Sequence, residues 1–299
     1  LIYKEEEELE GEDSDKIESY KKAIRIDPDD VKAHNNLGLA YDKSGKYKEA
    51  IESYKQAIKI DPDYATAHNN LGVVYGELGK YYDAIEAYKQ AIKIKPDYAN
   101  AHFNLGIAYG GLGRHQEAIE SFKQAIRIDP YNADAHFNLG IAYGGLGRHQ
   151  EAIESFKQAI RIDPYNADAH YNLGLAYRKS GKSGWYKEAV ESYRQAIKIN
   201  PDYKYAHYNL GSFYFSIGEY EEAIKSLKQA IRIDPDDAGV HALLGLTYRQ
   251  AGKHEEAIKS YKQAIKIKPD HAKAHNNLGS AYNKLGKYEE AIESLKQAI

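Results

Sequence analysis

VKAHNNLGLAYDKSGKYKEAIESYKQAIKIDPDY, residues 31–64, decides the fold of this chain. Apolar residues recur at helical spacing in two segments, the first with Ala33, Leu37, Ala40 and Tyr41 and the second with Ala50, Ile51, Tyr54, Ala57 and Ile58. Gly45 lies between the segments and suits the left-handed residue that ends a helix. Pro62 prevents the second helix from continuing. The stretch therefore predicts two antiparallel helices joined by a short turn.

The same stretch returns along the chain at a fixed interval. Successive prolines stand 34 residues apart except once, where the interval is 37. A period in this range is typical of stacked units that bury their apolar faces against one another. We expect one continuous all-α solenoid of antiparallel helix pairs, with repeats at 31–64, 65–98, 99–132, 133–166, 167–203, 204–237 and 238–271. We expect a degenerate first repeat at 1–30, where Gly11 aligns with Gly45, and a truncated last repeat at 272–299.

This pattern resembles the tetratricopeptide repeat family. The resemblance rests on an apolar–glycine pair and a tyrosine in the first helix, then an alanine, an aromatic residue and an alanine in the second, and a closing proline. In the quoted repeat these are Leu37, Gly38, Tyr41, Ala50, Tyr54, Ala57 and Pro62. The columns recur in the later repeats, with Leu227 and Leu295 as exceptions in the aromatic column. The resemblance implies a right-handed superhelix whose first helices line the concave side.

Composition and charge restrict the classes of function. The 299 residues carry a formal net charge of −3, with 42% apolar residues, 28% charged residues and no cysteine. No global positive field would attract nucleic acid or anionic lipid, thiol catalysis is excluded, and no apolar run reaches the ~18–20 residues of a membrane span. Basic residues of the second helices, such as Lys55 and Lys59, alternate with acids, which favours a solvated face. We expect a protein or peptide partner, no nucleic acid, no membrane and a cytoplasmic location.

The two ends of the sequence differ from the regular repeats. The start, LIYKEEEELE, is acidic where a signal peptide would be basic, and the absence of methionine indicates an internal fragment or a trimmed chain. The last second helix ends without a polar cap, so we expect end-to-end self-association through uncapped terminal repeats. Repeats 99–132 and 133–166 differ only at Asn100 and Asp134, which indicates recent duplication or deliberate design.

Residues 178–190, RKSGKSGWYKEAV, contain a GKS fragment and the only tryptophan. A phosphate-binding loop needs a glycine where Ala176 stands, and it follows a strand rather than a helix. The nucleotide interpretation fails on both counts. Alignment with the quoted repeat places Ser183, Gly184 and Trp185 as an insertion in the turn between two helices. Two interpretations remain: a tolerated loop insertion, or a loop in which Trp185 anchors a partner.

Histidine forms another column, at positions 34, 68, 102, 136, 170, 207, 241 and 275. Equivalent side chains of neighbouring repeats lie about 8–10 Å apart, too far to share one metal ion. His271 and His275 share a helix face but have no evident third ligand. Serine, aspartate and histidine repeat as columns without a unique catalytic cluster. We expect no metal, no cofactor and no enzyme activity.

An asparagine column lies on the first helices and is the main binding-site candidate. Its members are Asn36, Asn70, Asn104, Asn138, Asn172, Asn209 and Asn277. A side-chain amide offers both donors and an acceptor, which suits the backbone of an extended peptide. The column resembles the asparagine ladder of O-linked N-acetylglucosamine transferases and kinesin light chains, and the resemblance implies peptide binding in the concave groove. Alternatively, asparagine simply fits an exposed helix position, and duplication copied it.

Neighbouring columns vary along the chain and indicate where the groove is apolar. The middle repeats contribute aromatic and aliphatic candidates, namely Phe103, Phe137, Tyr171, Tyr208, Ile107 and Ile141. The pairs Gly110–Gly111 and Gly144–Gly145 remove side chains one turn further on, so we expect a roomy apolar groove there. The basic residues that the family uses to grip a peptide carboxylate are not present here as a set.

These features favour a non-catalytic scaffold that binds extended, partly apolar peptide segments. One alternative is the substrate-presenting repeat region of a larger glycosyltransferase-like protein. Another is a designed or near-consensus array without a native partner.

Overall fold

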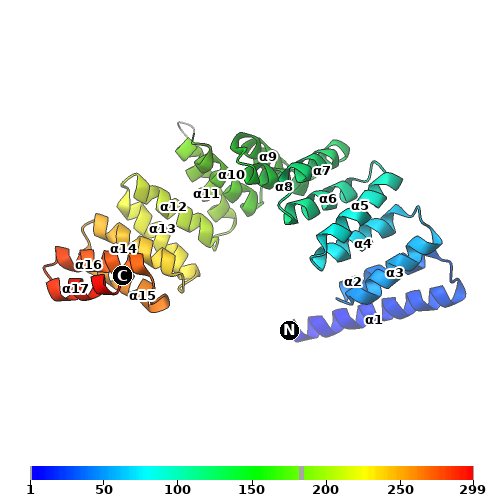
Figure 1. Cartoon of the computed structure of the whole chain (residues 1–299), viewed down its shortest axis with the longest axis horizontal. Coiled ribbons are helices and arrows are strands. Elements are labelled where there is room, and N and C mark those ends of the chain that lie inside the picture. The colour runs from blue at the N-terminus through cyan, green and yellow to red at the C-terminus, as the bar shows by residue number, and fades with distance from the viewer. Residues whose placement is uncertain (1, 182–184, 299) are drawn as a thin grey trace. The chain divides into compact units, whose positions relative to one another are not determined.

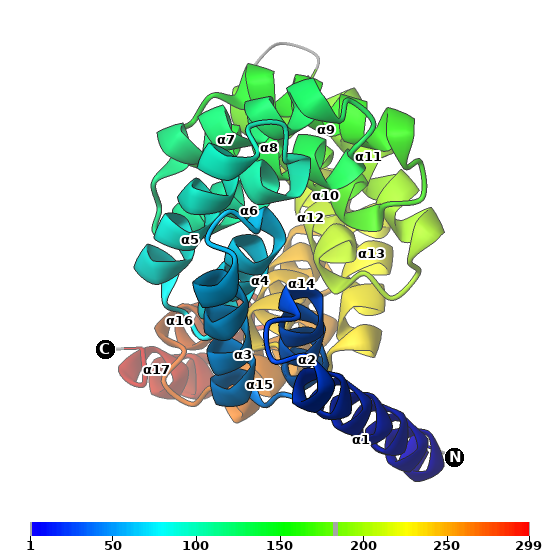
Figure 2. The same cartoon turned by 90° about the vertical axis from the view of Figure 1, so that its right-hand side faces the viewer.

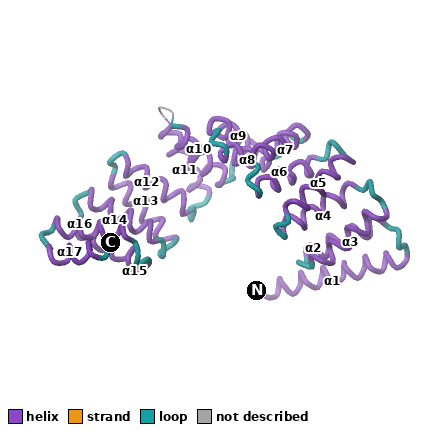
Figure 3. The backbone as a smooth tube through the Cα atoms, viewed as in Figure 1, coloured by secondary structure: helices purple, strands orange, loops and turns teal. Residues whose placement is uncertain are grey.

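The computed structural model describes residues 2–181 and 185–298, with side chains from residue 14 onward. Every regular element in these residues is an α-helix, and short loops connect the helices (Figure 3). The chain divides into two compact units, Leu1–Ile162 and Asp163–Ile299. The predicted all-α solenoid of antiparallel helix pairs is confirmed within each unit (Figure 1). None of the described helices combines the length and apolarity needed to cross a membrane.

The described helices begin and end close to the positions that the repeat predicts. The first unit contains α1 (Ile2–Ile26), α2 (Val31–Lys43), α3 (Tyr47–Ile60), α4 (Ala65–Glu77), α5 (Tyr81–Ile94), α6 (Ala99–Gly111), α7 (His115–Ile128), α8 (Ala133–Gly145) and α9 (His149–Ile162). The second contains α10 (Ala167–Ser180), α11 (Trp185–Ile199), α12 (Lys204–Ser216), α13 (Tyr220–Ile233), α14 (Ala238–Gln250), α15 (His254–Ile267), α16 (Ala272–Lys284) and α17 (Tyr288–Lys296).

The turn within a repeat is built by glycine. Gly45 has φ 69°, a left-handed conformation that residues with a Cβ rarely adopt. The Lys46 amide donates to the Tyr41 carbonyl at 2.8 Å, and the Gly45 amide donates to the Asp42 carbonyl at 2.9 Å. These two bonds satisfy carbonyls at the end of α2 in the manner of a Schellman motif. The chain can then reverse and begin α3.

The core of a repeat forms where its two helices approach most closely. Ala50, Tyr54 and Ala57 of α3 have no exposed surface. A Cβ added at Gly38 of α2 would lie 2.6 Å from the Tyr54 ring, so only glycine admits the ring there. Burial of such a side chain contributes about 1.5–3 kcal/mol. The residues that carry the family resemblance are therefore the packing residues of the helix pair.

First and second helices occupy different sides of each unit. Successive first helices contact one another directly, in the pairs α2–α4, α4–α6 and α6–α8 of the first unit and α12–α14 and α14–α16 of the second. We call the exposed side of the first helices the inner face. It is the side on which the candidate peptide-binding residues lie.

The beginning of the chain differs from the regular repeats. Residues 2–26 form one helix, α1 (Figure 2). The helix spans Gly11, so the chain does not turn there. Its last turns pack on α2, where Ile17 of α1 and Leu37 of α2 belong to one core cluster. The alignment of Gly11 with Gly45 therefore does not produce the same backbone, because a glycine permits a left-handed turn but does not require one.

Candidate functional site

The asparagines of the first three regular repeats are linked across the inner face. Asn70 Nδ2 donates to Asn35 Oδ1 at 3.2 Å, and Asn104 Nδ2 donates to Asn69 Oδ1 at 3.1 Å. The acceptors Asn35 and Asn69 are buried, whereas Asn36, Asn70 and Asn104 are half-buried. Each linking amide has two N–H groups and uses one of them in this bond. Sequence reasoning missed Asn35 and Asn69 as partners, although both stand beside the predicted column.

The next asparagines bond within their own helices. Asn138 Nδ2 donates to the Asp134 carbonyl and Asn172 Nδ2 to the Asp168 carbonyl, both at 2.9 Å. Within the first unit, Asn138 lacks the cross-repeat bond because Phe103 replaces the buried asparagine of the preceding repeat. These amides orient along their helices and still keep a second N–H and an oxygen.

Asn209 is buried and bonded to two neighbouring side chains. The side chain is only 6% exposed, donates to the Tyr171 hydroxyl at 3.1 Å and accepts from Arg178 Nη1 at 2.8 Å. Arg178 occupies a position held by glycine in the two preceding repeats, so its long side chain reaches Asn209. The sequence predicts Asn209 among the peptide-binding residues, and the structure places its side chain among buried contacts between neighbouring helices. Asn277, at the far end of the column, is half-buried.

The aromatic binding-site candidates of the first unit, Phe103 and Phe137, pack partly against core residues. The Phe103 ring lies 5.8 Å from that of Phe122, and the Phe137 ring lies 5.7 Å from that of Phe156. Because these rings are half-buried against buried partners, their removal would also destabilise the fold.

The aliphatic binding-site candidates, Ile107 and Ile141, are more exposed to solvent. Ile107 and Ile141 are each 42% exposed on the inner face. A Cβ added at Gly110 or Gly144 would meet no atom within 4 Å, so both positions open the surface beside these isoleucines.

The two adjacent glycines have another role. A Cβ at Gly111 would lie 2.8 Å from the Tyr81 ring, and a Cβ at Gly145 would lie 2.7 Å from the His115 ring. The expectation that all four glycines widen the groove is therefore wrong for Gly111 and Gly145. They admit the first side chain of the preceding second helix.

The aromatic candidates of the second unit lie in side-chain clusters. The Tyr171 ring lies 5.0 Å from Tyr203 in an edge-on contact and 5.9 Å from Tyr193. The Tyr203 hydroxyl donates to Asp168. Tyr208 is half-buried against the core cluster that contains Leu227. These tyrosines offer less free surface than the sequence suggests.

Trp185 is the first residue of α11 rather than part of a loop tip. Its half-buried ring lies 6.4 Å from Phe213 of α12 and packs against the core cluster that contains Tyr193. The prediction of an insertion in the turn is wrong for Trp185, because the helix begins early enough to place the indole on α12. Ser183 and Gly184 lie outside the described residues.

Two carboxyl groups that the sequence did not single out face each other on the inner face. Asp42 of α2 and Glu77 of α4 lie within hydrogen-bonding reach. Burial and the negative charge of Glu77 raise the pKa of Asp42 to about 6. Without a shared proton, the buried Asp42 Oδ1 has no donor, and the buried Tyr54 hydroxyl also lacks a partner. Burial, together with the charges of Asp42 and Glu77, raises the pKa of Tyr54 above its ordinary value.

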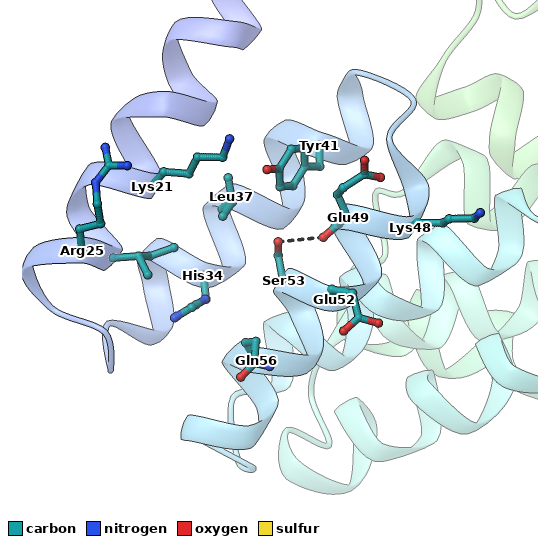
Figure 4. A pocket seen from close by; sticks show the side chains of 11 residues that line it. Lys21, Arg25, His34, Leu37, Tyr41, Lys48, Glu49, Glu52, Ser53 and Gln56 are labelled. Atoms are coloured by element: carbon teal, nitrogen blue, oxygen red, sulfur yellow. Dashed lines mark hydrogen bonds between the residues drawn. The ribbon is translucent and has the colours of Figure 1, made fainter.

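The side of the second helices carries open hollows. One of about 560 Å³ has Leu37 of α2 in its floor and both charge signs at its rim, such as Arg25 of α1 and Glu52 of α3 (Figure 4). Ser53, which lines it, already donates to the carbonyl of Glu49 at 2.8 Å.

Similar hollows of about 320–460 Å³ recur around Leu71, Leu139 and Leu173. A hollow that recurs in this way follows from the stacking of helix pairs. None of these four contains a residue of the predicted groove. The candidate site therefore stays on the inner face, where the residues differ between repeats.

The histidine column bonds to the loops between repeats. The Nε2 atom of His34 lies 3.0 Å from the Pro28 carbonyl, and the same bond recurs at His68, His102, His136, His170, His207, His241 and His275. His271 Nδ1 accepts from the Ala274 amide as a helix cap. In the part of the chain that the structure describes, no three histidine, cysteine or acidic residues are grouped to hold a metal.

Family models match the chain along most of its length. A tetratricopeptide repeat model matches residues 10–45 and 41–79, and a second matches residues 63–130. Residues 131–299 match the model of the cilia and flagella-associated protein 70 C-terminal domain. A comparison with curated protein sequences gave no match.

Several solved structures are similar to this chain. The crystal structure of MamA protein is 30% identical with a TM-score of 0.53, covering 57% of this chain and 92% of MamA. YrrB, described as a TPR protein with an unusual peptide-binding site, is 25% identical with a TM-score of 0.56, covering 64% of this chain and 96% of YrrB. The Cut9–Hcn1 hetero-tetramer shares the fold, at 20% identity and a TM-score of 0.57, covering 89% of this chain and 52% of the other.

Proposed function

The chain belongs to the tetratricopeptide repeat family, and we propose that it is a non-catalytic scaffold that binds extended, partly apolar peptides on its inner face. The observation that carries the proposal is the open apolar surface of α6 and α8. There Ile107 and Ile141 are each 42% exposed, and Gly110 and Gly144 leave open space beside them. Exposed aliphatic side chains in a row indicate a surface that gains free energy when a partner covers it.

Asparagines flank this surface and supply its polar contacts. Asn104 and Asn138 each use one N–H internally, and each amide retains a second N–H and an oxygen acceptor. An extended peptide presents backbone donors and acceptors whatever its sequence, while its side chains alternate between its two faces. The amides would hold the backbone, and the isoleucines would select apolar side chains at every second position.

The relatives support this class of function. YrrB, 25% identical to this chain, is described as having a peptide-binding site. The asparagine column favours a second candidate, a repeat region that presents peptide substrates to the catalytic part of a larger glycosyltransferase-like protein. Both candidates require the same inner-face contacts, and an association with a catalytic domain would distinguish them.

A selection experiment tests the proposal. Random 12-residue peptides displayed on phage would be selected on the immobilised chain and on the Ile107→Ser/Ile141→Ser variant. We expect the chain to enrich peptides with apolar residues at alternate positions and the variant to lose that enrichment. The same peptides recovered from both proteins, or no enrichment on either, would contradict the proposal.

A further inference from the structure

We propose that Asp42 and Glu77 bind a cationic group, the ammonium of a lysine or the guanidinium of an arginine, carried by a peptide on the inner face of the first unit. The inference rests on the proposed peptide binding and adds a charge preference to it. It starts from two acidic side chains that lie together without a positive partner: among the described residues, neither takes part in an ion pair.

The pair is unfavourable unless something neutralises it. Two carboxylates in reach of each other repel, and the burial of Asp42 strengthens the repulsion. Asp42 Oδ1 is buried without a donor, which leaves a hydrogen-bond acceptor unsatisfied. A proton held between the carboxyl groups relieves this at low pH. At neutral pH a cation from a ligand would do the same.

A buried hydroxyl also lies beside the pair. Tyr54 has no exposed surface, and its hydroxyl has no hydrogen-bond partner; Tyr193 and Tyr261 share this property in later repeats, where an arginine rather than an acid stands at the position of Asp42. The ring lies against Gly38, one turn before Asp42 on α2, so the hydroxyl faces the acidic pair, as the effect of both charges on its pKa also shows. The hydroxyl could donate to Asp42 when that carboxylate is ionised, and a bound cation would favour the ionised form.

The surroundings fit the stem of a long basic side chain. Leu39, 39% exposed, lies one turn before Asp42 on the inner face. On α4, the position equivalent to Asp42 is Gly76, where an added Cβ would meet only the Tyr88 hydroxyl, at 3.8 Å. Lysine and arginine place their methylene groups on such apolar surface and extend the charged end beyond it.

The number of carboxylates in the pair favours an organic cation over a metal ion as the ligand. The pair supplies two carboxylates, and the described residues contain no group of three acidic, histidine or cysteine side chains that could hold a metal. An ammonium has three N–H donors and a guanidinium has five, which two carboxylates can accept.

The pair is not a by-product of the repeat. The position of Asp42 is occupied by glycine at 76, 110 and 144 in the first unit. In the second unit it is occupied by Arg178, Phe215, Arg249 and Asn283, and the two arginines donate to Asn209 and Ser280. The acidic pair therefore occurs at one place in the first unit, as a binding site for one residue of a peptide requires.

The test compares peptide selections on three proteins. Random 12-residue peptides would be selected on the chain, on Asp42→Asn/Glu77→Gln, and on a matched control, Glu52→Gln/Asp83→Asn, which removes two exposed acids from α3 and α5. We expect lysine or arginine to be enriched at one position by the chain and the control, and not by the Asp42/Glu77 variant. Apolar enrichment should persist on all three.

A recovered peptide then gives the size of the effect. Its basic residue would be replaced by norleucine in a synthetic copy, and both peptides would be titrated calorimetrically. We expect the chain to lose about 10-fold or more in affinity, and the Asp42/Glu77 variant less than about 2-fold. Apolar enrichment without a basic residue on every protein would overturn the charge site and leave the proposed groove standing. No enrichment on any protein would overturn both. Whether lysine or arginine dominates tells the two cations apart.

Discussion

Asp42→Asn should stabilise the protein at neutral pH. Asp42 is ionised there although its pKa is raised to about 6 by burial and by Glu77. Asparagine has nearly the same shape and no charge, so it removes the repulsion and can donate to Glu77. A stabilising substitution of this kind is expected where a protein keeps an unfavourable charge for binding.

The magnitude follows from the two pKa values. The ordinary pKa of 3.8 and the raised value of about 6 set an upper limit of about 3 kcal/mol for the cost of ionising Asp42 in the folded state. Because Asp42 is only half-buried, water screens part of this cost, and we expect a gain of about 1 kcal/mol.

The sign of the pH dependence is fixed by the raised pKa. Between pH 3.8 and about 6 the folded state binds the Asp42 proton more tightly than the unfolded state does, so stability falls as pH rises through this window. The cost is fully present above the folded-state pKa. The advantage of Asp42→Asn should therefore be complete at pH 7.5 and fade towards pH 4.

Urea unfolding followed by circular dichroism at 222 nm, at pH 7.5 and pH 4.5, measures both effects. Asp97→Asn, at an exposed turn residue, is the matched control and should change stability by less than about 0.5 kcal/mol. Glu77→Gln should give a similar gain, and the double variant should gain less than the sum, because both changes remove one repulsion. A loss of stability at pH 7.5, or an equal gain at both pH values, would refute the reasoning.

Three further predictions concern contacts between helices. Gly111→Ala should lower the free energy of unfolding by about 1–3 kcal/mol, because its Cβ would lie 2.8 Å from the Tyr81 ring. Gly110→Ala, whose Cβ would meet no atom within 4 Å, should be neutral or stabilising by up to about 1 kcal/mol. Equal effects of the two substitutions in thermal unfolding would contradict these different roles of the two glycines. Trp185→Ala should lower the free energy of unfolding by about 1–3 kcal/mol, since the indole ring packs on α12. For the same reason, acrylamide should quench the fluorescence of Trp185 less in the folded protein than in the unfolded chain. Equally strong quenching in both states would place the ring in solvent instead. Asn209→Ala should cost about 1–3 kcal/mol because it removes two hydrogen bonds that join the buried Asn209 amide to the half-buried Tyr171 and the exposed Arg178, and it should leave peptide affinity in calorimetry unchanged. An intact fold with weakened binding would return this residue to the site.

The fold could be predicted because its determinants are local. Helical spacing, the left-handed Gly45 and the blocking Pro62 act within one repeat, and each is visible in 34 residues. The close packing of Gly38 against Tyr54 then explains why the same columns recur.

The site was harder to predict because its contacts join different repeats. Asn70 bonds to Asn35, and Glu77 approaches Asp42, each across 35 positions. This shared spacing shows that a residue on one first helix faces the residue one place further on in the next repeat. Applied to the sequence, that rule would have found the acidic pair.

Substitutions at single repeats also changed the role of individual columns. Arg178 stands where the two preceding repeats have glycine, and its guanidinium donates to the amide oxygen of Asn209. The two residues are 31 positions apart, so the sequence alone could not reveal this hydrogen bond. A column predicts a shared position on the helix surface, but the neighbours decide which of its members remain free.

Peptide binding on the inner face of α6 and α8 is tested most directly by titrating one selected peptide against two matched variants. Ile107→Ser/Ile141→Ser removes two side chains that are each 42% exposed, so a peptide that covers them gains about 1 kcal/mol from each. We predict that this variant binds at least about 10-fold more weakly. Tyr82→Ser/Tyr131→Ser, which removes side chains 70% and 81% exposed at the start of α5 and in the loop after α7, should bind like the unaltered chain. Equal affinity for the isoleucine variant and the unaltered chain, with both folded, would contradict peptide binding on the inner face.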